Sequence, residues 1–212
     1  MLSVCETFSS IQGESTRAGR KCFFIRLAGC SLDCSYCDTA YAKSGGTDAT
    51  VEELVKRAHD SGLELVEITG GEPLEQPETP QLCRALLDAG FEVLLETNGA
   101  QMLDEVPSGV AKIVDCKLPS SGMAERMREE NYALLGPGDE VKFVVSSHRD
   151  FEYAVEVTKR FDLAGTGCAL LVSPVWGEVE LPELAKWIME CDVPFRMQLQ
   201  MHRIIWGDKR GV

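Results

Sequence analysis

The sequence lacks a hydrophobic run long enough to cross a membrane, and it is poor in basic residues. No apolar stretch approaches the roughly 20 residues that a membrane-spanning helix requires. Lysine and arginine total 21 against 34 aspartates and glutamates, which gives a formal net charge of −13. Binding to a nucleic-acid backbone or to an anionic membrane depends on clustered basic residues. We therefore expect no nucleic-acid partner and no membrane partner.

The first residues also lack the features of a secretory signal. The segment Met1–Glu6 has neither a basic region nor an apolar stretch. Internal repeats, low-complexity tracts and long linkers are absent from the sequence as well. A chain of 212 residues has the usual length of one domain. We expect a cytoplasmic protein with a single domain over residues 1–212.

Cysteine, by contrast, is abundant, with nine in the chain. The number is odd and the cytosol keeps thiols reduced, so a disulfide framework is not expected. Six of the nine are scattered singly, and a buried free cysteine behaves as a small hydrophobic residue. The other three are Cys30, Cys34 and Cys37. Cysteines clustered in this way are more often metal ligands than packing residues.

Helical and strand patterns alternate along most of the chain. Helical spacing of apolar residues predicts helices over 51–58, behind a Thr50/Glu53 capping box, and over 82–89, 151–158 and 181–189. Short apolar runs predict strands over 22–27, 65–69, 91–97, 113–117, 140–145, 169–175 and 195–201, and 43–48 is predicted to be a surface loop. This alternation is typical of an α/β fold in which helices cover a parallel sheet. The strands are too few for a closed eight-stranded barrel, which leaves an incomplete barrel or an open sheet.

Chemically unusual residues follow the ends of the predicted strands. They are Cys30, Gly70–Pro73, Glu96–Gly99, Asp115–Lys117 and Ser173–Pro174. Parallel sheets bind ligands at the carboxyl ends of their strands. The coincidence therefore predicts one site at that edge of the sheet.

The cysteine cluster has the spacing Cys-x3-Cys-x2-Cys, which places three thiols on one loop. A structural zinc site needs four ligands, and the sequence has no second CxxC or HxxxH pair. Cys22 or His202 remains open as a fourth ligand. A four-iron cluster normally takes one thiolate on each iron, so three thiolates would leave one iron open to a substrate or cofactor.

This spacing resembles the signature of the radical S-adenosylmethionine (SAM) enzymes. The run Thr69–Pro73 resembles their second motif, a Gly-Gly-Glu-Pro sequence after the next strand. A narrower resemblance to the 7-carboxy-7-deazaguanine synthase family covers nearly the whole chain, through residues 6–14, 24–30, 37–39, 96–99, 198–202, 206 and 211–212. Two positions depart from that pattern. Ser15 stands where a glycine usually follows, and Met201 interrupts the usual Gln-Leu-His or Gln-Thr-His.

The resemblance implies a radical SAM core built as an abbreviated TIM-type barrel of about six parallel strands. Its implied cofactors are one 4Fe-4S cluster, SAM and Mg²⁺. The implied reaction converts 6-carboxy-5,6,7,8-tetrahydropterin to 7-carboxy-7-deazaguanine with loss of ammonia, a step toward queuosine. The implied partners are the pterin, a reducing electron donor such as a flavodoxin or ferredoxin, and a second copy in a homodimer.

The same resemblance assigns a ligand to each matching residue. It places the cluster on Cys30, Cys34 and Cys37, and Mg²⁺ on Thr39. SAM is expected to contact Tyr36, Cys37, Asp38, Gly71, Asp115, Cys116, Lys117, Ser173, Pro174, Val175 and Trp176. The substrate is expected to contact Ile11, Gln12, Gly13, Glu14, Arg26, Thr69, His202 and Val212, with residues 207–212 folded over the pterin.

Arg26 has two interpretations from the residues alone. It lies in an otherwise apolar strand, where an unpaired guanidinium group would be costly. It is either the partner of the substrate carboxylate, bound through its planar fork, or one half of an internal ion pair with one of the 34 acids.

Two other functions also remain open. A radical SAM activase that installs a glycyl radical on a partner protein would share the cluster and the glycine motif. It would have no need of Gln12, Arg26 and Thr69. A zinc-binding interaction module without catalysis would use the cysteines alone.

Overall fold

A nine-stranded sheet forms the centre of the structure, a computed structural model that describes residues 1–207 and 209–212. The strand order is β3-β1-β2-β4-β5-β6-β7-β8-β9. The strands are β1 (Leu2–Ile11), β2 (Lys21–Leu27), β3 (Thr47–Ala49), β4 (Leu65–Gly70), β5 (Glu92–Thr97), β6 (Ala111–Cys116), β7 (Glu140–Val145), β8 (Ala169–Pro174) and β9 (Arg196–Met197). Strand β1 is antiparallel to β2 and β3, whereas β2 and β4 to β9 run parallel. The sheet ends at β3 and β9, so the predicted incomplete barrel is confirmed.

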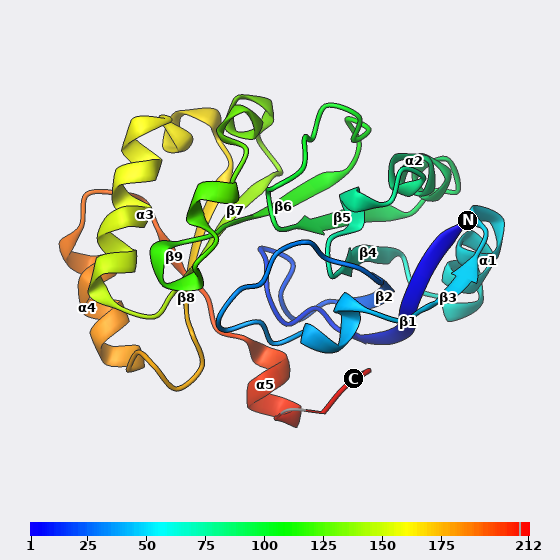
Figure 1. The fold of residues 1–212 in the computed structure, drawn as a ribbon, viewed down its shortest axis with the longest axis horizontal. Coiled ribbons are helices and arrows are strands. Elements are labelled where there is room, and N and C mark those ends of the chain that lie inside the picture. Colours follow the sequence, from blue (N-terminus) through cyan, green and yellow to red (C-terminus); the bar gives the residue numbers. More distant parts are fainter. Residues whose placement is uncertain (208) are drawn as a thin grey trace.

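Helices cover the outer face of this sheet. They are α1 (Val51–Ser61), α2 (Thr79–Asp88), α3 (His148–Arg160) and α4 (Leu181–Glu190). Figure 1 shows α1 and α2 along one end of the arc of strands and α3 and α4 along the other. A short fifth helix, α5 (Met201–Trp206), lies at the open side of the arc. In the described part of the chain, no helix is both long enough and apolar enough to span a bilayer.

Apolar side chains hold the helices to the sheet in two clusters. One cluster joins α1 and α2 to β1, β2, β4 and β5, and includes the fully buried Leu54, Leu86 and Ile68. The other joins α3 and α4 to β6, β7 and β8, and includes Phe151 and Phe143. Burial of this apolar area is the main driving force for the fold, and it fixes which face of each strand points inward.

The predicted helices and strands agree with the structure where the sequence carries a clear local signal. The capping box of α1 is present: Thr50 Oγ1 accepts a hydrogen bond from the Glu53 main-chain nitrogen at 3.2 Å, and Glu53 Oε2 accepts one from the Thr50 nitrogen at 2.9 Å. Gly62 follows in the left-handed conformation that commonly ends a helix.

The predictions are wrong at the two edges of the sheet. Residues 43–48 are not one surface loop, because Thr47–Ala49 form β3 and pair with Leu2–Val4 of β1. The last predicted strand, 195–201, is too long, since β9 has two residues and Met201 begins α5. Strand β1 was not expected at all. The edge strands β3 and β9, and β1 beside β3, depend on pairing with distant segments, which leaves a weak local pattern.

The inner face of the sheet has an apolar floor with polar side chains above it. Cys22, Phe24, Leu65, Leu94 and Ile113 pack together to form the floor. Side chains alternate between the two faces of a strand, so the next inward position on each strand lies two residues closer to its carboxyl end. Those positions are occupied by Arg26, Glu67, Glu96 and Asp115, beside Lys142 on β7.

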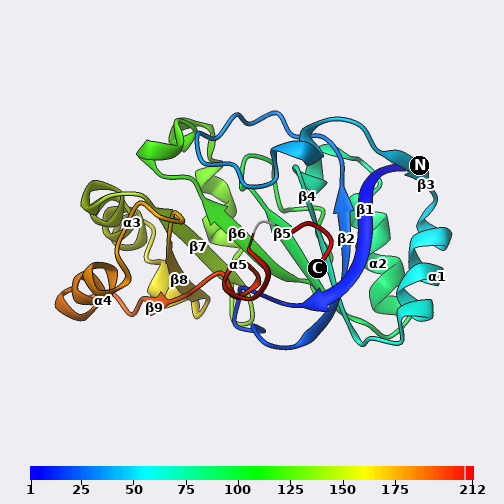
Figure 2. The same ribbon diagram turned by 90° about the horizontal axis from the view of Figure 1, so that it is seen from below.

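The loop between β1 and β2 crosses the inner side and reaches the other end of the sheet. The Thr16 nitrogen donates hydrogen bonds to Glu140 on β7 at 3.1 Å, and the Ser15 nitrogen donates to Gln198 Oε1 at 2.7 Å. The Met201 nitrogen donates to the Gly13 carbonyl at 3.0 Å. These contacts connect the chain ahead of α5 to the loop. They close the bottom of the incomplete barrel, and in Figure 2, which views the molecule from below, α5 and the C-terminus lie across the inner side of the strands.

Candidate active site

A cavity of about 730 Å³ lies on the inner side of the sheet, above the apolar floor. Loops 11–15 and 30–39, the inward positions of β2 and β4 to β7, and the C-terminal tail line it. Most of the predicted site residues line this single cavity: Ile11, Gln12, Gly13, Glu14, Arg26, Cys30, Cys34, Tyr36, Cys37, Asp38, Thr39, Thr69, Gly71, Asp115, Lys117, Val175, Trp176, His202 and Val212.

Three of the residues that are expected to contact SAM do not line the cavity, namely Cys116, Ser173 and Pro174. The Cys116 side chain points to the outer core, where its Sγ lies 3.2 Å from the Tyr132 hydroxyl oxygen that donates to it. The alternation of β6 explains this, because Asp115 takes the inward position and its neighbour must face out. Ser173 lies on the inner side of β8 opposite Val144, and its buried hydroxyl has no hydrogen-bond partner among residues 1–207 and 209–212.

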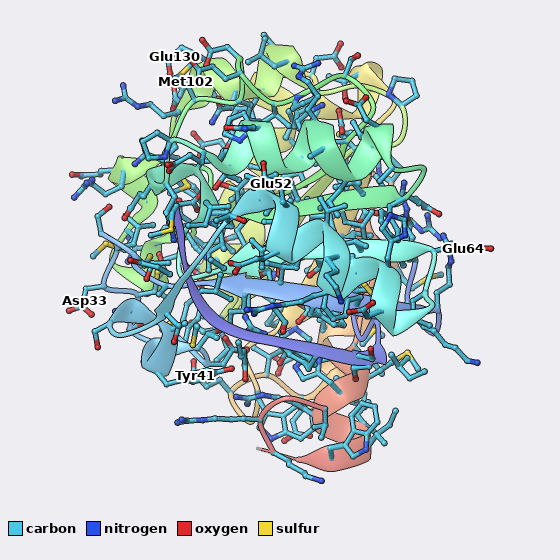
Figure 3. All side chains as sticks on the ribbon, turned by 90° about the vertical axis from the view of Figure 1, so that its right-hand side faces the viewer. Asp33, Tyr41, Glu52, Glu64, Met102 and Glu130 are labelled. Carbon is cyan, nitrogen blue, oxygen red and sulfur yellow. The ribbon has the colours of Figure 1, made fainter. Side chains whose placement is uncertain are left out.

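The loop after β2 carries the three clustered cysteines. Asn98 Nδ2 donates to Cys30 Sγ at 3.6 Å, and the Ser35 hydroxyl donates to the Ser120 carbonyl at 2.7 Å, which anchors the loop against the residues after β6. Burial raises the pKa of the Cys30 and Cys34 thiols. Figure 3 shows that Asp33, from the same loop, lies at the edge of the molecule, and its side chain is 92% exposed.

The arrangement of the three thiols does not match a single-metal site. Across the residues that the structure describes, no three His, Cys, Asp or Glu side chains converge on one point as ligands of a single ion would. A four-iron cluster does not need that convergence, because each thiolate binds a different iron. Cys22 is not a fourth ligand, since it is completely buried in the floor of the barrel. Three thiols on one loop are the donor set that a four-iron cluster with one open iron requires.

The Gly-Gly-Glu-Pro run packs the end of β4 against the cysteine loop. The Glu72 nitrogen donates to the Gly29 carbonyl at 2.7 Å, and a Cβ atom on Gly71 would overlap that carbonyl. The buried Glu72 carboxylate accepts hydrogen bonds from the Asn98 nitrogen at 2.6 Å and the Thr97 hydroxyl at 2.7 Å. Burial raises the pKa of Glu72 to about 7. Gly71 is thus required for close approach of the backbone, and Glu72 connects β4 to β5.

A charged network that the sequence did not reveal lies on the polar layer of the cavity. Lys142 Nζ forms ion pairs with Glu14 Oε2 at 2.9 Å, Asp115 Oδ1 at 3.2 Å and Glu96. Burial by itself would raise the pKa of Asp115, but Lys117 and Lys142 lower it overall. The same three acids hold the pKa of Lys142 well above its usual value, against the opposing effect of burial. Charged residues at alternate positions within apolar strands were the available signal.

The predicted substrate residues lie around this network. Gln12 donates its side-chain amide to Glu67, and Thr69 donates its hydroxyl to Glu96 at 2.9 Å. Both lie on the inner side of the sheet, together with Glu14. His202 follows the first residue of α5 and packs directly against Gly13, where an added Cβ would overlap its ring. The sequence predicted that these groups and Glu96 lie at one site, but it did not predict Glu67 as a neighbour.

Arg26 forms an internal ion pair with an acid, which is one of the two roles that the sequence left open for it. Its Nε lies 3.0 Å from Glu6 Oε1, which also accepts a hydrogen bond from the Tyr41 hydroxyl at 2.7 Å. Its guanidinium also lies over the Phe8 ring, with its carbon 5.9 Å from the ring centroid. Arg26 lines the cavity as well, so the ion pair holds the side chain there without excluding a substrate contact.

The C-terminal tail closes one side of the cavity. Residues 209–212 are among the lining residues, and the Arg210 guanidinium lies 4.0 Å above the ring of Tyr41. Tyr41 and Asp33 appear on the same side of the molecule in Figure 3. Residue 208, which belongs to the predicted tail segment 207–212, lies outside the described residues.

Asp38 and Thr39 place two oxygen groups beside the cysteine loop. The Thr39 hydroxyl donates to Asp38 Oδ1 at 2.7 Å, and both residues line the cavity. Burial by itself would raise the pKa of Asp38, but the Thr39 hydrogen bond and nearby Lys142 lower it overall. Oxygen donors of this kind suit Mg²⁺, which keeps several waters and needs few protein ligands.

Comparison with known proteins agrees with this geometry. The radical SAM superfamily model matches residues 24–120. The 7-carboxy-7-deazaguanine synthase of Chlorobaculum tepidum is 43% identical over 215 residues, covering 100% of this chain and 97% of that protein. The synthase of Koribacter versatilis is 37% identical over 228 residues, covering all of both chains.

Solved structures show the same fold. The crystal structure of QueE from Escherichia coli matches with a TM-score of 0.70 at 23% identity and covers 93% of each chain. Streptococcus suis SuiB bound to its precursor peptide SuiA matches with a TM-score of 0.61 at 13% identity, covering 83% of this chain and 48% of that one. The full-length relatives disfavour the glycyl-radical activase. By its sequence over the whole length and by its fold, this chain belongs to the 7-carboxy-7-deazaguanine synthase family of radical SAM enzymes.

Proposed function

We propose that this chain is a lyase that converts 6-carboxy-5,6,7,8-tetrahydropterin to 7-carboxy-7-deazaguanine with loss of ammonia. One observation carries the proposal: a single cavity joins the three-cysteine loop to a polar layer containing Gln12, Arg26 and Thr69. Full-length similarity to synthases of that name supports it. The product belongs to the supply of queuosine precursors, and residues 1–212 act as one radical SAM domain.

The cavity divides into a cofactor end and a substrate end. Cys30, Cys34 and Cys37 would hold a 4Fe-4S cluster. Gly71 has no side chain and packs against Gly29 and Cys30, so its backbone would approach SAM beside the cluster. When bound, these cofactors supply the one-electron chemistry that takes a hydrogen atom from the substrate and later returns it. The unpartnered Ser173 hydroxyl on the inner side of β8 is a further polar group that a bound cofactor could satisfy.

The remaining SAM and substrate contacts follow the family resemblance. Tyr36, Asp38, Lys117, Val175 and Trp176 line the cofactor end of the cavity together with Asp115. A main-chain contact remains open for Cys116 and Pro174, whose side chains face away. At the other end, Ile11, Gln12, Gly13 and Glu14 lie below the tail that ends at Val212.

Further parts of the proposal concern the surroundings of the enzyme. An external one-electron donor such as a flavodoxin or ferredoxin is required by the chemistry, and the family resemblance favours a homodimer. The nine cysteines are all free in the structure, which suits a reducing compartment such as the cytoplasm. The acidic surface supports the absence of nucleic-acid and membrane partners.

The direct test is anaerobic turnover. The iron-loaded protein is incubated with 6-carboxytetrahydropterin, SAM, Mg²⁺ and a reductant, and formation of 7-carboxy-7-deazaguanine and ammonia is followed together. Absence of both products, from protein with full iron and sulfide content, would overturn the proposal.

Arg26→Ala is expected to weaken pterin binding by at least about tenfold, because a charge-assisted pair with the substrate carboxylate contributes roughly 1.5–3 kcal/mol and about 1.4 kcal/mol corresponds to tenfold. SAM affinity should barely change. Dissociation constants of both ligands measure this. Arg20→Ala removes an exposed cation that pairs with Glu92 and serves as the matched control. Parent-like pterin binding by Arg26→Ala would place the substrate carboxylate elsewhere.

Thr39→Ala is expected to raise the Mg²⁺ concentration needed for half-maximal turnover, since it removes one oxygen donor beside Asp38. The iron content and visible absorption of the cluster should stay unchanged. Titration of activity with Mg²⁺ checks this, with Thr39→Ser as the variant that should restore the response and Thr47→Ala, an exposed threonine on β3, as the control. An unaltered Mg²⁺ response would remove Thr39 from the metal site.

A further inference from the structure

Glu67 is a buried carboxyl group in the cavity, and it forms no ion pair with any cation among residues 1–207 and 209–212. It lies on the inner face of β4, directly above the apolar floor, and is 3% exposed. Among the described residues, one hydrogen bond reaches its carboxyl group, from the side-chain amide of Gln12. The other acids of this layer all pair with Lys142, namely Glu14, Glu96 and Asp115. Burying an unpaired charge is far more costly than burying a neutral acid, so Glu67 is expected to carry a proton.

The groups that face Glu67 have opposing effects on its charge. Burial is the largest influence, and the carboxylates of Glu96 on β5 and Glu14 after β1 act in the same direction. Lys142 on β7 and Arg26 on β2 oppose them. Burial and the two acids dominate, and they hold the pKa of Glu67 well above its usual value. The raised pKa and the lack of a cationic partner both favour the protonated, neutral carboxyl group. The adjacent Cys22 thiol, whose pKa is also raised by burial, is neutral too.

The hydrogen bonds of Gln12 determine where that proton is held. Gln12 Oε1 accepts the main-chain N–H of Glu14 at 2.9 Å, so the other end of its amide is the donor. That donor, Nε2, points at Glu67 Oε2, which must therefore be an acceptor. The proton of the neutral acid then resides on Oε1. Together, Glu67 on β4 and Gln12 in the loop after β1 offer a hydroxyl donor, a carboxyl acceptor and a second amide N–H.

A pterin presents a matching pattern on its pyrimidine ring. A ring nitrogen that accepts a hydrogen bond adjoins the 2-amino group, which donates one. A neutral carboxyl group can donate to the first and accept from the second at the same time. We propose that Glu67, positioned by Gln12, recognises the aminopyrimidine edge of the substrate and makes the 2-amino group a requirement for binding. This inference rests on the proposed function and identifies the part of the pterin that is read at the floor of the cavity.

Two substitutions separate recognition from structural support. Glu67→Gln keeps one donor and one acceptor in the same shape, whereas Glu67→Leu removes both. Dissociation constants are measured anaerobically on the iron-loaded protein with 6-carboxypterin, an unreactive oxidised form of the substrate, and with its analogue carrying oxygen in place of the 2-amino group. Thermal unfolding and iron content of each variant establish that it is folded and loaded.

The expected results differ between the two variants. Glu67→Gln should bind 6-carboxypterin within about threefold of the parent, and Glu67→Leu at least about tenfold more weakly. The parent and Glu67→Gln should prefer 6-carboxypterin over the 2-oxo analogue by at least about tenfold, and Glu67→Leu should lose that preference. Parent-like binding by Glu67→Leu would overturn the inference. An equal loss for both ligands would also overturn it, because that result indicates structural support alone.

A pH profile gives a second readout that a structural role would not alter. As pH rises through the raised pKa of Glu67, the acid loses the proton that it donates, so the parent's affinity for 6-carboxypterin should fall. The Glu67→Gln side chain cannot ionise, so the affinity of this variant should not fall in that way. Titration of 6-carboxypterin itself affects the parent and the variant equally and so does not account for a difference between them. Identical pH profiles would contradict the assignment.

Asp139→Asn is the matched control, since it neutralises a buried acid outside the cavity that pairs with Lys112. It should leave the preference for the 2-amino group unchanged. Ligand binding by the parent distinguishes failure of the proposed function from failure of this inference. A parent that binds neither compound would overturn the proposed function and this inference with it. A parent that binds 6-carboxypterin while Glu67→Leu binds it equally well would overturn the inference alone.

Discussion

Replacing any one of Cys30, Cys34 and Cys37 with alanine is expected to abolish turnover and the visible absorption of the cluster. The three thiols lie on one loop, after β2, and all three line the cavity. A four-iron cluster needs a thiolate on each of three irons to leave the fourth open, so loss of one ligand removes the arrangement on which the chemistry depends. Iron and acid-labile sulfide content, with the absorption spectrum, measure the effect.

Two other cysteines serve as controls for this experiment. Cys5 is partly buried on β1 and Cys191 follows α4, and neither lines the cavity. Their alanine variants should retain the full iron content and turnover of the parent. The cluster assignment would be wrong if the triple variant of Cys30, Cys34 and Cys37 kept its iron, or if Cys5→Ala lost as much iron as Cys30→Ala.

Lys142→Met is expected to destabilise the folded chain by about 3–5 kcal/mol, because removal of one member of a buried ionic network leaves its partners without compensation. The Lys142 side chain is 6% exposed and forms ion pairs with Glu14, Glu96 and Asp115. The methionine side chain fills a similar volume but carries no charge. Urea unfolding followed by circular dichroism measures the loss.

The pH dependence of this variant distinguishes electrostatics from packing. Lys142 is one of the two cations that lower the pKa of Asp115, so its loss raises that pKa in the folded chain. The folded variant then binds a proton at Asp115 more readily than the folded parent does, so the deficit should shrink as pH falls. Lys56→Met removes an exposed ion pair with Asp60 on α1 and should cost at most about 0.5 kcal/mol at any pH. A deficit independent of pH would indicate lost packing instead.

The sequence carried enough local information to predict most elements of the parallel sheet. Strand β7 begins and ends at the predicted residues, Glu140 and Val145, because a short apolar run has turn residues on both sides. The capping box at Thr50 marked the start of α1 in the same way. Strand β1 carried little local signal. Half of its residues are polar, and its place in the sheet depends on pairing with β2 and β3.

The candidate site shows the same division. Cys30, Cys34 and Cys37 were recognisable as candidate cluster ligands because they lie close together in the sequence. Gln12 and Arg26 were recognised through the family resemblance. Glu67, Glu96 and Lys142 lie on three different strands and share no sequence motif. Only the strand register, which gives each of them the inward position on its strand, shows that they lie on the same layer.

The sequence by itself determined the fold class, the loop that would hold the cluster and the family, since each depends on periodicity or on short motifs that are complete within one segment. The tertiary structure decided which of two neighbouring residues faces the cavity. Asp115 points inward and Cys116 outward, although both belong to one predicted strand end. It also decided that Glu67 has a neutral amide rather than a lysine as its partner. The physical reason is that burial and charge compensation depend on groups from distant strands, and their positions are fixed only when the whole sheet forms.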